Sequence, residues 1–375
     1  MDKKNKNPNV PNLRFTNNQL KDFKIVDICK LKQGNQYDLK QQFTEEKPDL
    51  KRFIRIVDYT QKTNDIRYVY SNGSENYVDC TDVVVVRYGA SAGYVGRGIN
   101  GIIANNLFTI RPINSALLNK SYLYHYLNAP VIQKQLNNTQ SSGMPALNFQ
   151  TINNLHILLP EYQEQRQIAV FLDKIDERIQ TQIKIIDDYN SLKMGIYNCM
   201  FKENYADYKL KQLAYIVKGD QINNDQLLSN GSYYMMNGGT SPSGYLDSYN
   251  VSENTISISE GGNSCGYVQF NSSPFWSGGH CYTIQNVNSA LIENKYLYHY
   301  LKYKEKEIMN LRIGTGLPNI QKKDLENFTI LVPSLLIQRK NLALFEMLDE
   351  KISILNEELA NLQKQKKYLL CNMFI

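Results

Sequence analysis

Reactive side chains gather at two places in the sequence. The stretch KSYLYHYLN, residues 120–128, carries three tyrosines and His125, and NKYLYHYLK, residues 294–302, repeats the pattern around His299. The two stretches could be a duplicated functional site or two copies of one structural part. The only neighbouring Cys/His pair that could indicate a metal site is His280 and Cys281. A single Cys/His pair cannot supply the four ligands of a structural metal site.

Several common catalytic motifs are missing from the chain. No GxxxxGK[ST] phosphate loop, HExxH motif or DPPY-like tetrapeptide occurs. The glycines of GYVGRG, residues 93–98, run in the reverse order from a dinucleotide-binding fingerprint. Pro48-Asp49 could open a nuclease-like carboxylate cluster, but no well-placed Glu-x-Lys follows it. The sequence therefore predicts a chain that is not an enzyme by itself and holds no metal ion.

The composition is typical of a soluble protein with two domains. The 375 residues suffice for two ordinary domains plus connectors, with 42% hydrophobic and 21% charged residues. No run of about 18 apolar residues is available to span a membrane. The six cysteines form no CxxC pair, which fits a reducing cytoplasm. Residues 1–19 lack the apolar core of a signal peptide and are expected to form a flexible arm.

The net charge of +6 is unevenly distributed. Residues 20–160 hold 16 Lys and Arg against 11 Asp and Glu, whereas residues 204–333 hold 10 against 11. The first half is therefore basic, as expected of a surface that faces phosphates, and the second is nearly neutral. Charge alone does not establish nucleic-acid binding, because many basic proteins bind none.

The chain repeats itself at a nearly constant spacing. Residues 93–95 and 266–268 both read GYV, and the strand-like endings LHILLP and FTILVP stop at Pro160 and Pro333. EQRQIAVFLDKIDERI then meets IQRKNLALFEMLDEKI, which aligns Gln165 with Gln338 and Asp176 with Asp349. So many coincidences in constant order indicate a tandem duplication.

Each copy has the same order of predicted elements. A β-rich, glycine-rich stretch comes first, followed by the Tyr/Leu helix, a Gly-Pro loop, a short strand and a long helix. This order predicts an α+β fold with two tandem globular domains, each followed by a long helix. The expected parts are an arm at 1–19, domains at 20–160 and 204–333, and long helices at 161–203 and 334–375.

The long helices carry the strongest periodicity in the chain. Their apolar residues recur every three or four positions, interrupted by Gln182 in the first helix and Lys366 in the second. A stripe of about six turns outruns any small domain and is typical of a coiled coil. Two such helices in one chain are expected to pair antiparallel, with pseudo-twofold symmetry. The expected pairing residues are Ile168, Leu172, Ile175, Ile179 and Ile186 in the first helix, and Leu348, Ile352, Leu355, Leu359 and Leu362 in the second.

The stretch LPEYQEQRQIAVFLDKIDERI, residues 159–179, resembles a known junction. It is similar to the junction between recognition domain and conserved helix in specificity subunits of type I restriction–modification systems. The matching residues are Pro160, Glu164, Gln165, Ile168, Ala169, Leu172, Asp176 and Ile179, and after the second copy Pro333, Gln338, Phe345, Asp349 and Ile352. The second copy departs from the pattern, with Ile337 in place of the acid and Asn341 in place of the isoleucine. A role for that glutamate common to both junctions is therefore in doubt.

The resemblance implies a function for the whole chain. Each globular domain would read one half of a split double-stranded DNA target, and the paired helices would set the unspecified spacer. Such subunits are not enzymes; they dock two methyltransferase subunits, and two restriction-translocase subunits can join. S-adenosylmethionine, ATP and magnesium would then belong to the partner subunits, and this chain would hold no cofactor.

Polar loops with glycine are the physical candidates for DNA contact, because there the backbone can approach DNA closely. Arginine suits guanine edges or phosphates, and Asn or Gln suits adenine. The stretches concerned are 32–36, 87–97 and 140–144 in the first domain, and 218–224, 260–264 and 312–316 in the second. The candidate residues are Lys32, Asn35, Gln36, Arg87, Tyr88, Ser91, Tyr94, Arg97, Ser141, Ser142, Lys218, Gln221, Asn223, Asn263, Ser264, Arg312 and Thr315.

The repeated Tyr/His stretch belongs to the core under this interpretation. Two domains that read different bases should diverge where they read, and this stretch did not diverge. We therefore expect a structural helix with a satisfied histidine. A scaffold whose two repeats bind proteins and never read bases is the competing hypothesis, and a self-sufficient DNA-modifying enzyme is a third.

Overall fold

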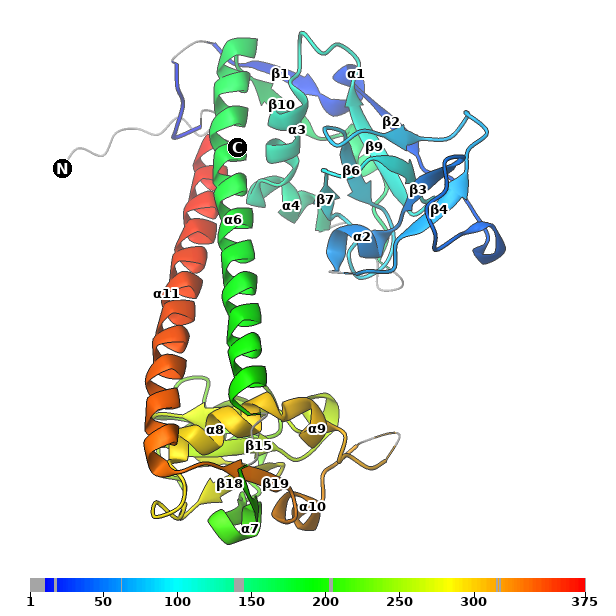
Figure 1. Ribbon diagram of the computed structural model, residues 1–375. Helices are drawn as coiled ribbons and strands as arrows, with labels where there is room; N and C mark the ends of the chain where they lie inside the picture. Colours follow the sequence, from blue (N-terminus) through cyan, green and yellow to red (C-terminus); the bar gives the residue numbers. More distant parts are fainter. Residues whose placement is uncertain are drawn as a thin grey trace, which may run out of the picture. The chain divides into compact units, whose positions relative to one another are not determined.

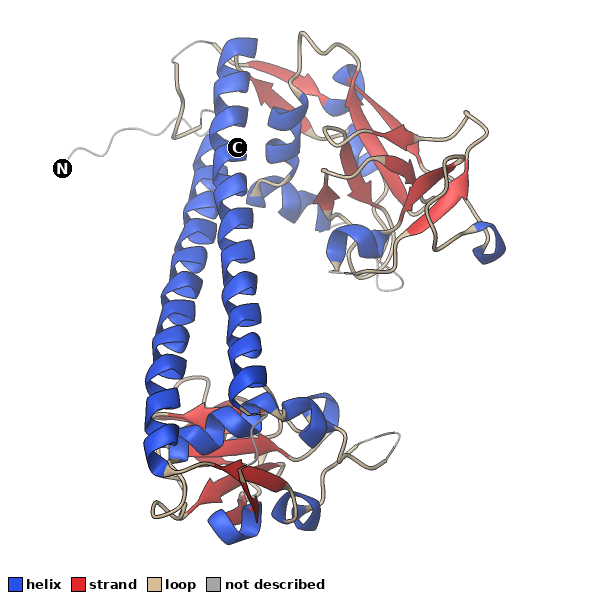
Figure 2. Ribbon diagram, in the orientation of Figure 1, coloured by secondary structure: helices blue, strands red, loops and turns tan. Residues whose placement is uncertain are grey.

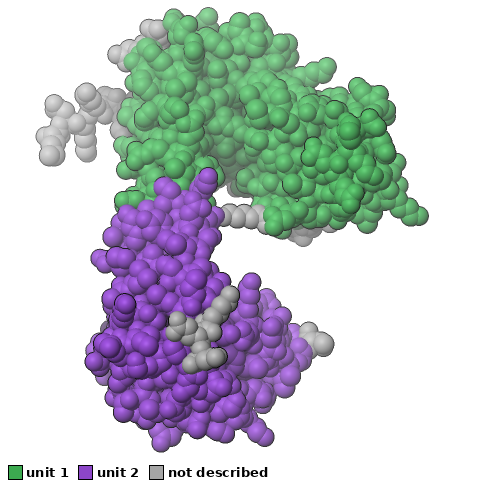
Figure 3. All heavy atoms as spheres, in the orientation of Figure 1, with its two compact units in different colours: residues 1–183, 357–375 green, residues 184–356 purple. Residues whose placement is uncertain are grey.

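The computed structural model describes residues 11–374, apart from residues 17–18, 62, 138–144, 202–204, 315 and 317. The chain divides into two compact units (Figure 3). Unit 1 comprises residues 1–183 and 357–375, and unit 2 comprises residues 184–356. The boundaries fall inside the two long helices, so each unit contains a globular part and segments of both helices.

Unit 1 is built around two four-stranded sheets and one strand pair (Figure 1). The first sheet has the order β2 (Cys29–Gln33), β9 (Leu107–Pro112), β6 (Val83–Val86) and β7 (Val95–Gly96). The second has the order β4 (Arg67–Tyr70), β3 (Leu50–Ile54), β8 (Gly101–Ile103) and β5 (Tyr77–Val78). β1 (Lys21–Lys24) pairs antiparallel with β10 (His156–Leu159) and so joins the two ends of the globular part.

Short helices complete unit 1. They are α1 (Ile25–Ile28), α2 (Ile56–Thr60), α3 (Lys120–Leu127), α4 (Pro130–Asn137) and α5 (Phe149–Asn153), with a 3-10 turn at Leu39–Gln41. β6 reads VVVV and is buried on both faces, which explains its continuous apolar run. Val83 and Val85 join side chains of α3 and of the first turns of the following long helix in one core, and Val84 and Val86 pack in a second cluster on the other face.

Unit 2 repeats this plan with shorter sheets (Figure 2). The main sheet has the order β12 (Tyr215–Lys218), β18 (Cys281–Gln285), β15 (Thr255–Ser259) and β16 (Val268–Asn271). A three-stranded sheet contains β14 (Gly244–Leu246), β13 (Tyr233–Met236) and β17 (Trp276–Ser277), and β11 (Ala206–Lys209) pairs with β19 (Thr329–Val332). The helices are α7 (Leu210–Leu213), α8 (Asn294–Tyr303), α9 (Glu305–Met309) and α10 (Lys322–Glu326), with 3-10 turns at Asn224–Gln226 and Gly262–Ser264.

The two long helices, α6 (Tyr162–Met200) and α11 (Leu335–Met373), pair with each other. Asp176 of α6 meets Lys366 of α11 at 2.5 Å, and Gln182 donates to Glu358 at 3.0 Å. In unit 2, Lys193 of α6 forms an ion pair with Asp349 of α11. Successive residues along α6 contact residues of decreasing number in α11, so the pairing is antiparallel, as predicted. The two polar residues that interrupt the apolar stripes, Gln182 and Lys366, both make contacts between the helices.

The apolar stripe positions differ in burial. Ile168, Leu172, Ile179, Ile186, Leu348 and Leu355 are buried, and Ile175, Ile352, Leu359 and Leu362 are partly exposed. Ile168 and Leu172 also belong to the core of unit 1, so the first turns of α6 pack on their own globular part. The prediction of an α+β fold with two β-rich domains and paired long helices is confirmed. Among the described helices, none is long and apolar enough to cross a membrane.

Part of the expected flexible arm is held in place. Arg14 Nη2 lies 2.7 Å from the Glu164 carboxylate, and Glu164 also accepts hydrogen bonds from the backbone of Phe15 and from Thr16. The backbone N–H of Leu13 donates to the carbonyl of Asn372 near the end of α11. Residues 13–16 are therefore packed rather than free, because a buried carboxylate needs donors. Residues 1–10 and 17–18 lie outside the described part of the chain.

Candidate nucleic-acid interface

The loop that follows β6 in unit 1 contains the largest group of candidate residues. Its backbone turns at Gly89 and Gly93, both at positive φ, where glycine avoids the strain of a side chain. The N–H of Gly89 donates to the carbonyl of Pro145, which ties the loop to the segment leading into α5. Tyr94 leaves the loop 42% exposed. Ala90 and Tyr94 are thus the exposed residues of this turn, whereas Ala92 and Gly93 are buried.

The loop after β15 in unit 2 has the same backbone. Gly262 and Gly266 adopt positive φ, and the N–H of Gly262 donates to the carbonyl of Pro318. Asn263 and Ser264 lie within it, as Ala90 and Ser91 lie in the first loop. The duplication thus preserves the backbone of the loop and changes its side chains.

Both loops contain the sequence Gly-x-Ser-x-Gly, as GASAG at 89–93 and GNSCG at 262–266. In hydrolases this motif places a nucleophilic serine on a turn between a strand and a helix. Here each loop runs from one strand to another, from β6 to β7 and from β15 to β16. Among the described side chains, no histidine is hydrogen-bonded to Ser91 or Ser264. The geometry therefore gives the motif a turn-forming role.

Arg87 stands at the start of the first loop, half-buried. Its Nη1 donates to Oε1 of Gln33 at the end of β2, over 2.6 Å. The guanidinium carbon lies 4.8 Å from the ring centre of Tyr88 and 4.4 Å from that of Phe149. Cation–π contacts of this kind hold a guanidinium in place without neutralising it. Arg87 therefore remains available for an anion or a base edge.

Arg97 has a different environment. Its Nη2 lies 2.5 Å from Asp173 of α6, its Nη1 donates to Ser121 over 2.6 Å, and its guanidinium stacks 3.9 Å from the Tyr124 ring centre. These contacts attach the globular part of unit 1 to α6. The geometry favours a structural role for Arg97 over contact with DNA.

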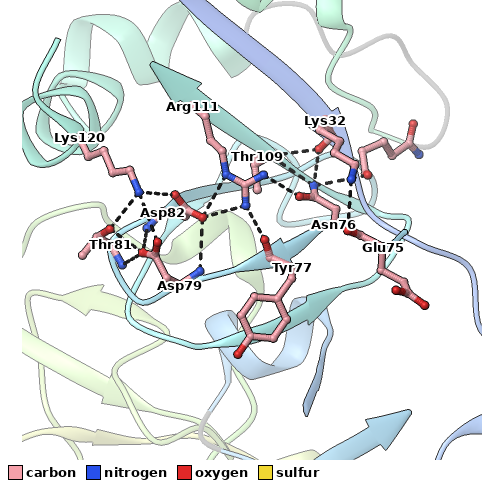
Figure 4. Close-up of polar contacts among 11 residues, drawn as sticks. Lys32, Glu75, Asn76, Tyr77, Asp79, Thr81, Asp82, Thr109, Arg111 and Lys120 are labelled. Atoms are coloured by element: carbon pink, nitrogen blue, oxygen red, sulfur yellow. Dashed lines mark hydrogen bonds and ion pairs between the residues drawn. The ribbon is translucent and has the colours of Figure 1, made fainter. Parts of the chain in front are cut away.

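Lys32 also takes part in a local network (Figure 4). Its Nζ donates to the carbonyls of Ser74 and Glu75 over 3.4 and 3.1 Å. Close by, Arg111 makes two hydrogen bonds to the buried carboxylate of Asp82, over 3.0 and 2.8 Å. Figure 4 shows these side chains converging from β9, β2 and the segment before β6. Arg111 Nη2 also donates to the carbonyl of Tyr77 in β5 over 2.6 Å, so the network joins the two sheets of unit 1.

The buried acid in this network is charged. Although burial alone would raise the pKa of Asp82, hydrogen bonds from Arg111 and Lys120 hold that pKa below its usual range. Lys120 Nζ lies 2.7 Å from Asp82. Although burial alone would lower the pKa of Lys120, the hydrogen bond to Asp82 and its charge raise that pKa. Asp82 therefore links α3 to the sheet.

The other candidates differ in their exposure to solvent. Gln36, Gln221, Asn223, Asn263 and Arg312 are exposed, whereas Tyr88, Ser91 and Ser264 are half-buried. Asn35 is half-buried and its Oδ1 accepts a hydrogen bond from the backbone of Asn76. Ser141, Ser142 and Thr315 lie outside the described residues. Lys218 donates to Glu260 over 2.7 Å at a cavity considered below.

The repeated Tyr/His stretch forms α3 and α8 and belongs to the core, as predicted. His125 is fully buried and lies 2.7 Å from Asp173, and His299 is buried against the hydroxyl of Tyr197 at the same distance. Burial lowers the pKa of both histidines. Neutral imidazoles in these positions are structural groups. Among the described residues, no cluster of three His, Cys, Asp or Glu is placed to hold a metal ion.

A family model matches both globular parts of the chain. The model describes the type I restriction modification DNA specificity domain, and it matches residues 17–187 and again residues 202–364. The chain belongs to the family of type I DNA specificity subunits. In this family the subunit is non-catalytic, and the two matches give this specificity subunit two target-recognition domains.

Individual relatives of this chain are also type I specificity subunits. The specificity subunit of the type I restriction enzyme MjaVIII from Methanocaldococcus jannaschii is 23% identical over 352 residues, which cover 81% of this chain and 80% of that one. A type I specificity subunit of Mycoplasma pneumoniae is 34% identical over 155 residues. That match covers 41% of each chain, so it spans about two fifths of the M. pneumoniae relative.

Solved structures share the fold of this specificity subunit. The crystal structure of a type I restriction–modification S subunit from M. genitalium matches with a TM-score of 0.66 at 20% identity, covering 98% of this chain and 99% of that one. A chain from a study of complex assembly in the type I system matches with a TM-score of 0.52 at 16% identity, covering 94% and 96%. At these identities the likeness concerns the fold alone.

Some residues that organise the specificity subunit were not singled out from the sequence. Asp173, which receives Arg97, Ser121 and His125, is one of them, and Asp82 is another. Their partners lie 29 to 76 positions away along the chain. The repeat offered one signal for the contact between Ser121 and Asp173. These two residues align with Lys295 and Glu346, which form an ion pair in the second copy.

Proposed function

We propose that this subunit directs a restriction–modification complex to a split double-stranded DNA target. Residues 20–160 would read one half of the target and residues 204–333 the other half. One observation carries the proposal: the two domains keep the same loop backbone after β6 and β15 but place different side chains on it. A shared scaffold with divergent loop residues is what reading two different half-sites requires.

The loop residues provide the chemistry of base recognition. Base edges in the major groove are distinguished by hydrogen-bond donors and acceptors, and arginine, asparagine and glutamine match them in pairs. Among the candidates, Arg87, Asn263 and Arg312 have the side-chain types best suited to recognising base edges. Phosphate contacts by lysines would position each domain without specifying sequence.

The pair of long helices would set the spacer. Each has 39 residues, which corresponds to roughly 58 Å of helix at 1.5 Å per residue. Antiparallel pairing would give the two recognition domains a fixed separation along the rod, and the number of unread base pairs would then follow from helix length. The exposed apolar residues along the rod, such as Phe171, Met347 and Ile354, would contribute to docking of two methyltransferase subunits.

The partner subunits would supply the catalysis. S-adenosylmethionine would bind the methyltransferase subunits, and ATP and magnesium would bind restriction-translocase subunits where these are present. The complex would work in the cytoplasm, where the six cysteines, all unpaired among the described residues, stay reduced.

Methylation mapping tests this function. Cells lacking other adenine methylation would express the chain with its methyltransferase partner, and methylated adenines would be located across their DNA. We expect one split motif with two defined halves and a constant spacer. A folded complex that assembles without producing any sequence-specific methylation would contradict base reading and favour a protein-binding scaffold.

A further inference from the structure

Three loops of unit 2 meet at one cavity of about 520 Å³. The cavity is lined by Lys218 at the end of β12, Glu260 after β15 and His280 before β18, together with Asn237, Pro318 and Asn319. Lys218 and Glu260 begin two of the stretches that the sequence marked as candidate contact loops, and Pro318 closely follows the third. The loops that vary between the domains therefore converge on a single concave site, which we call the loop pocket.

The corresponding place in unit 1 can be located from backbone hydrogen bonds. The N–H of Arg87 donates to the carbonyl of Asn106, and its carbonyl accepts from Leu147. The N–H of Glu260 donates to the carbonyl of His280, and its carbonyl accepts from Ile320. Arg87 and Glu260 therefore occupy equivalent positions in the two domains.

A second pair of positions corresponds in the same way. The N–H of Gly34 donates to the carbonyl of Leu107, and that of Gly219 donates to the carbonyl of Cys281. Gln33 and Lys218 directly precede these two glycines. Each equivalent side-chain pair is in contact: Gln33 accepts from Arg87 over 2.6 Å, and Lys218 donates to Glu260 over 2.7 Å.

The two domains thus place opposite charges at one position. Unit 1 has a cation, Arg87, beside a neutral amide, and unit 2 has an anion, Glu260, beside a cation. A pair that served folding alone would be expected to keep its chemistry, as Gln165 and Gln338 do. Both of these glutamines are buried and donate to the carbonyl five residues before them.

The geometry of Glu260 leaves one oxygen for a ligand. Oε1 accepts from Lys218 and, over 3.0 Å, from the hydroxyl of Tyr282, so the carboxylate is held firmly. Oε2 lies 3.8 Å from His280 Nδ1, and no hydrogen bond from the described residues reaches it. Glu260 is 92% buried and lines the loop pocket. A carboxylate oxygen of this kind accepts hydrogen bonds and repels acceptors.

We propose that this position specifies one base in each half of the target: Arg87 selects guanine, and Glu260 selects a base with an exocyclic amino group. Guanine presents two acceptors in the major groove, O6 and N7, that match a guanidinium, whereas cytosine and adenine present an amino donor that matches a carboxylate. The inference rests on the proposed function, because it assumes that both domains read DNA.

The test uses the full chain in complex with its methyltransferase subunits, with methylation motifs mapped for each variant. In Glu260→Ala, which removes both acceptor oxygens, one position of one half-site should lose its preference by roughly 5- to 150-fold, the range of one good base contact. The double variant Lys218→Gln/Glu260→Arg carries the unit 1 residues in unit 2, and should shift that same position toward guanine. Arg87→Lys keeps the charge but loses the two-pronged donor, so it should relax one position of the other half-site.

Controls separate base reading from other effects. Glu253→Ala removes the same groups in the exposed turn before β15 and should leave the motif unchanged. Competing duplexes with purine in place of adenine, or 2-pyrimidinone in place of cytosine, lack the amino group and show which base Glu260 selects. If Glu260→Ala does not fold, Glu260→Asp keeps the charge, withdraws the oxygen and should relax the same position.

Two results would overturn the proposal while leaving the proposed function intact. One is a wild-type motif in the folded Glu260 variants, and the other is a uniform loss of methylation at all sequences, which indicates a phosphate or structural role. A wild-type complex that gives no split motif would instead refute the proposed function itself.

Discussion

Replacing Asp173 with asparagine should loosen the attachment of the first recognition domain to α6. The carboxylate accepts hydrogen bonds from Arg97, Ser121 and His125 over 2.5 to 2.8 Å, and the side chain of His125 is fully buried. Asparagine keeps one acceptor and loses the charge opposite Arg97. Breaking a buried ion pair costs about 3–5 kcal/mol, and Asp173 is 31% exposed, so we expect a loss of about 2–3 kcal/mol of unfolding free energy.

The dependence on pH gives this prediction a second test. Although burial alone would raise the pKa of Asp173, the bonds from His125, Arg97 and Ser121 hold that pKa well below its usual range. The folded carboxyl group therefore stays charged at pH values where the unfolded one, with a pKa of about 4, takes up a proton. The stability that Asp173 contributes is complete above about pH 5 and declines as the pH falls further.

The measurement is urea unfolding of the wild type and of Asp173→Asn at pH 7 and at pH 3.5, followed by circular dichroism. Hydrogen exchange of residues 120–127 reports whether the loss is local to α3. The matched control is Glu346→Gln, at the equivalent position of unit 2. Glu346 pairs with Lys295 with both side chains about half exposed, so its loss should cost less than about 1 kcal/mol. Equal effects of the two substitutions, or a gap that widens at low pH, would refute the reasoning.

Three further outcomes follow from the structure. Glu164→Ala should cost about 2–3 kcal/mol and speed hydrogen exchange at residues 13–16, because Arg14 and the backbone there lose their buried acceptor; unchanged exchange would contradict the contact. Asp82→Asn should destabilise unit 1 by about 2–3 kcal/mol at pH 7 and less at pH 3.5, measured by thermal unfolding, since Asp82 binds Arg111 and Lys120 as a carboxylate. Inserting about one helical turn into α6, with a matching insertion in α11, should lengthen the spacer in the methylation motif by roughly one to two base pairs, because a turn rises 5.4 Å; altered half-sites with an unchanged spacer would contradict the role of the helices.

Much of the architecture was predictable because it depends on local periodicity and on the repeat. The three- and four-residue spacing of apolar residues predicted both long helices, and the tandem repeat predicted that they pair antiparallel. The duplicated Tyr/His stretch was assigned to the core because it did not diverge, and His125 and His299 are indeed buried. Gln182 and Lys366 could be recognised only as interruptions, since the sequence does not show which residue of the other helix each one meets.

The parts that could not be predicted depend on distant polar partners. Arg97 looked like a free arginine in a glycine-rich loop, but Asp173, 76 positions away, holds its guanidinium. Arg14 stood in an apparently free arm, but Glu164, 150 positions away, binds it. Periodicity and spacing do not report contacts of this kind, because a single ion pair leaves no pattern along the chain.

Exchange of one recognition domain tests the central claim most directly. Residues 20–160 would be replaced by the corresponding domain of another specificity subunit, and methylated adenines would be mapped in cells that also carry the methyltransferase partner. The account predicts a motif in which one half changes, while the other half and the spacer stay as they are in the wild type. An unaltered motif, or a change in both halves, would contradict the claim that each domain reads its own half of the DNA target.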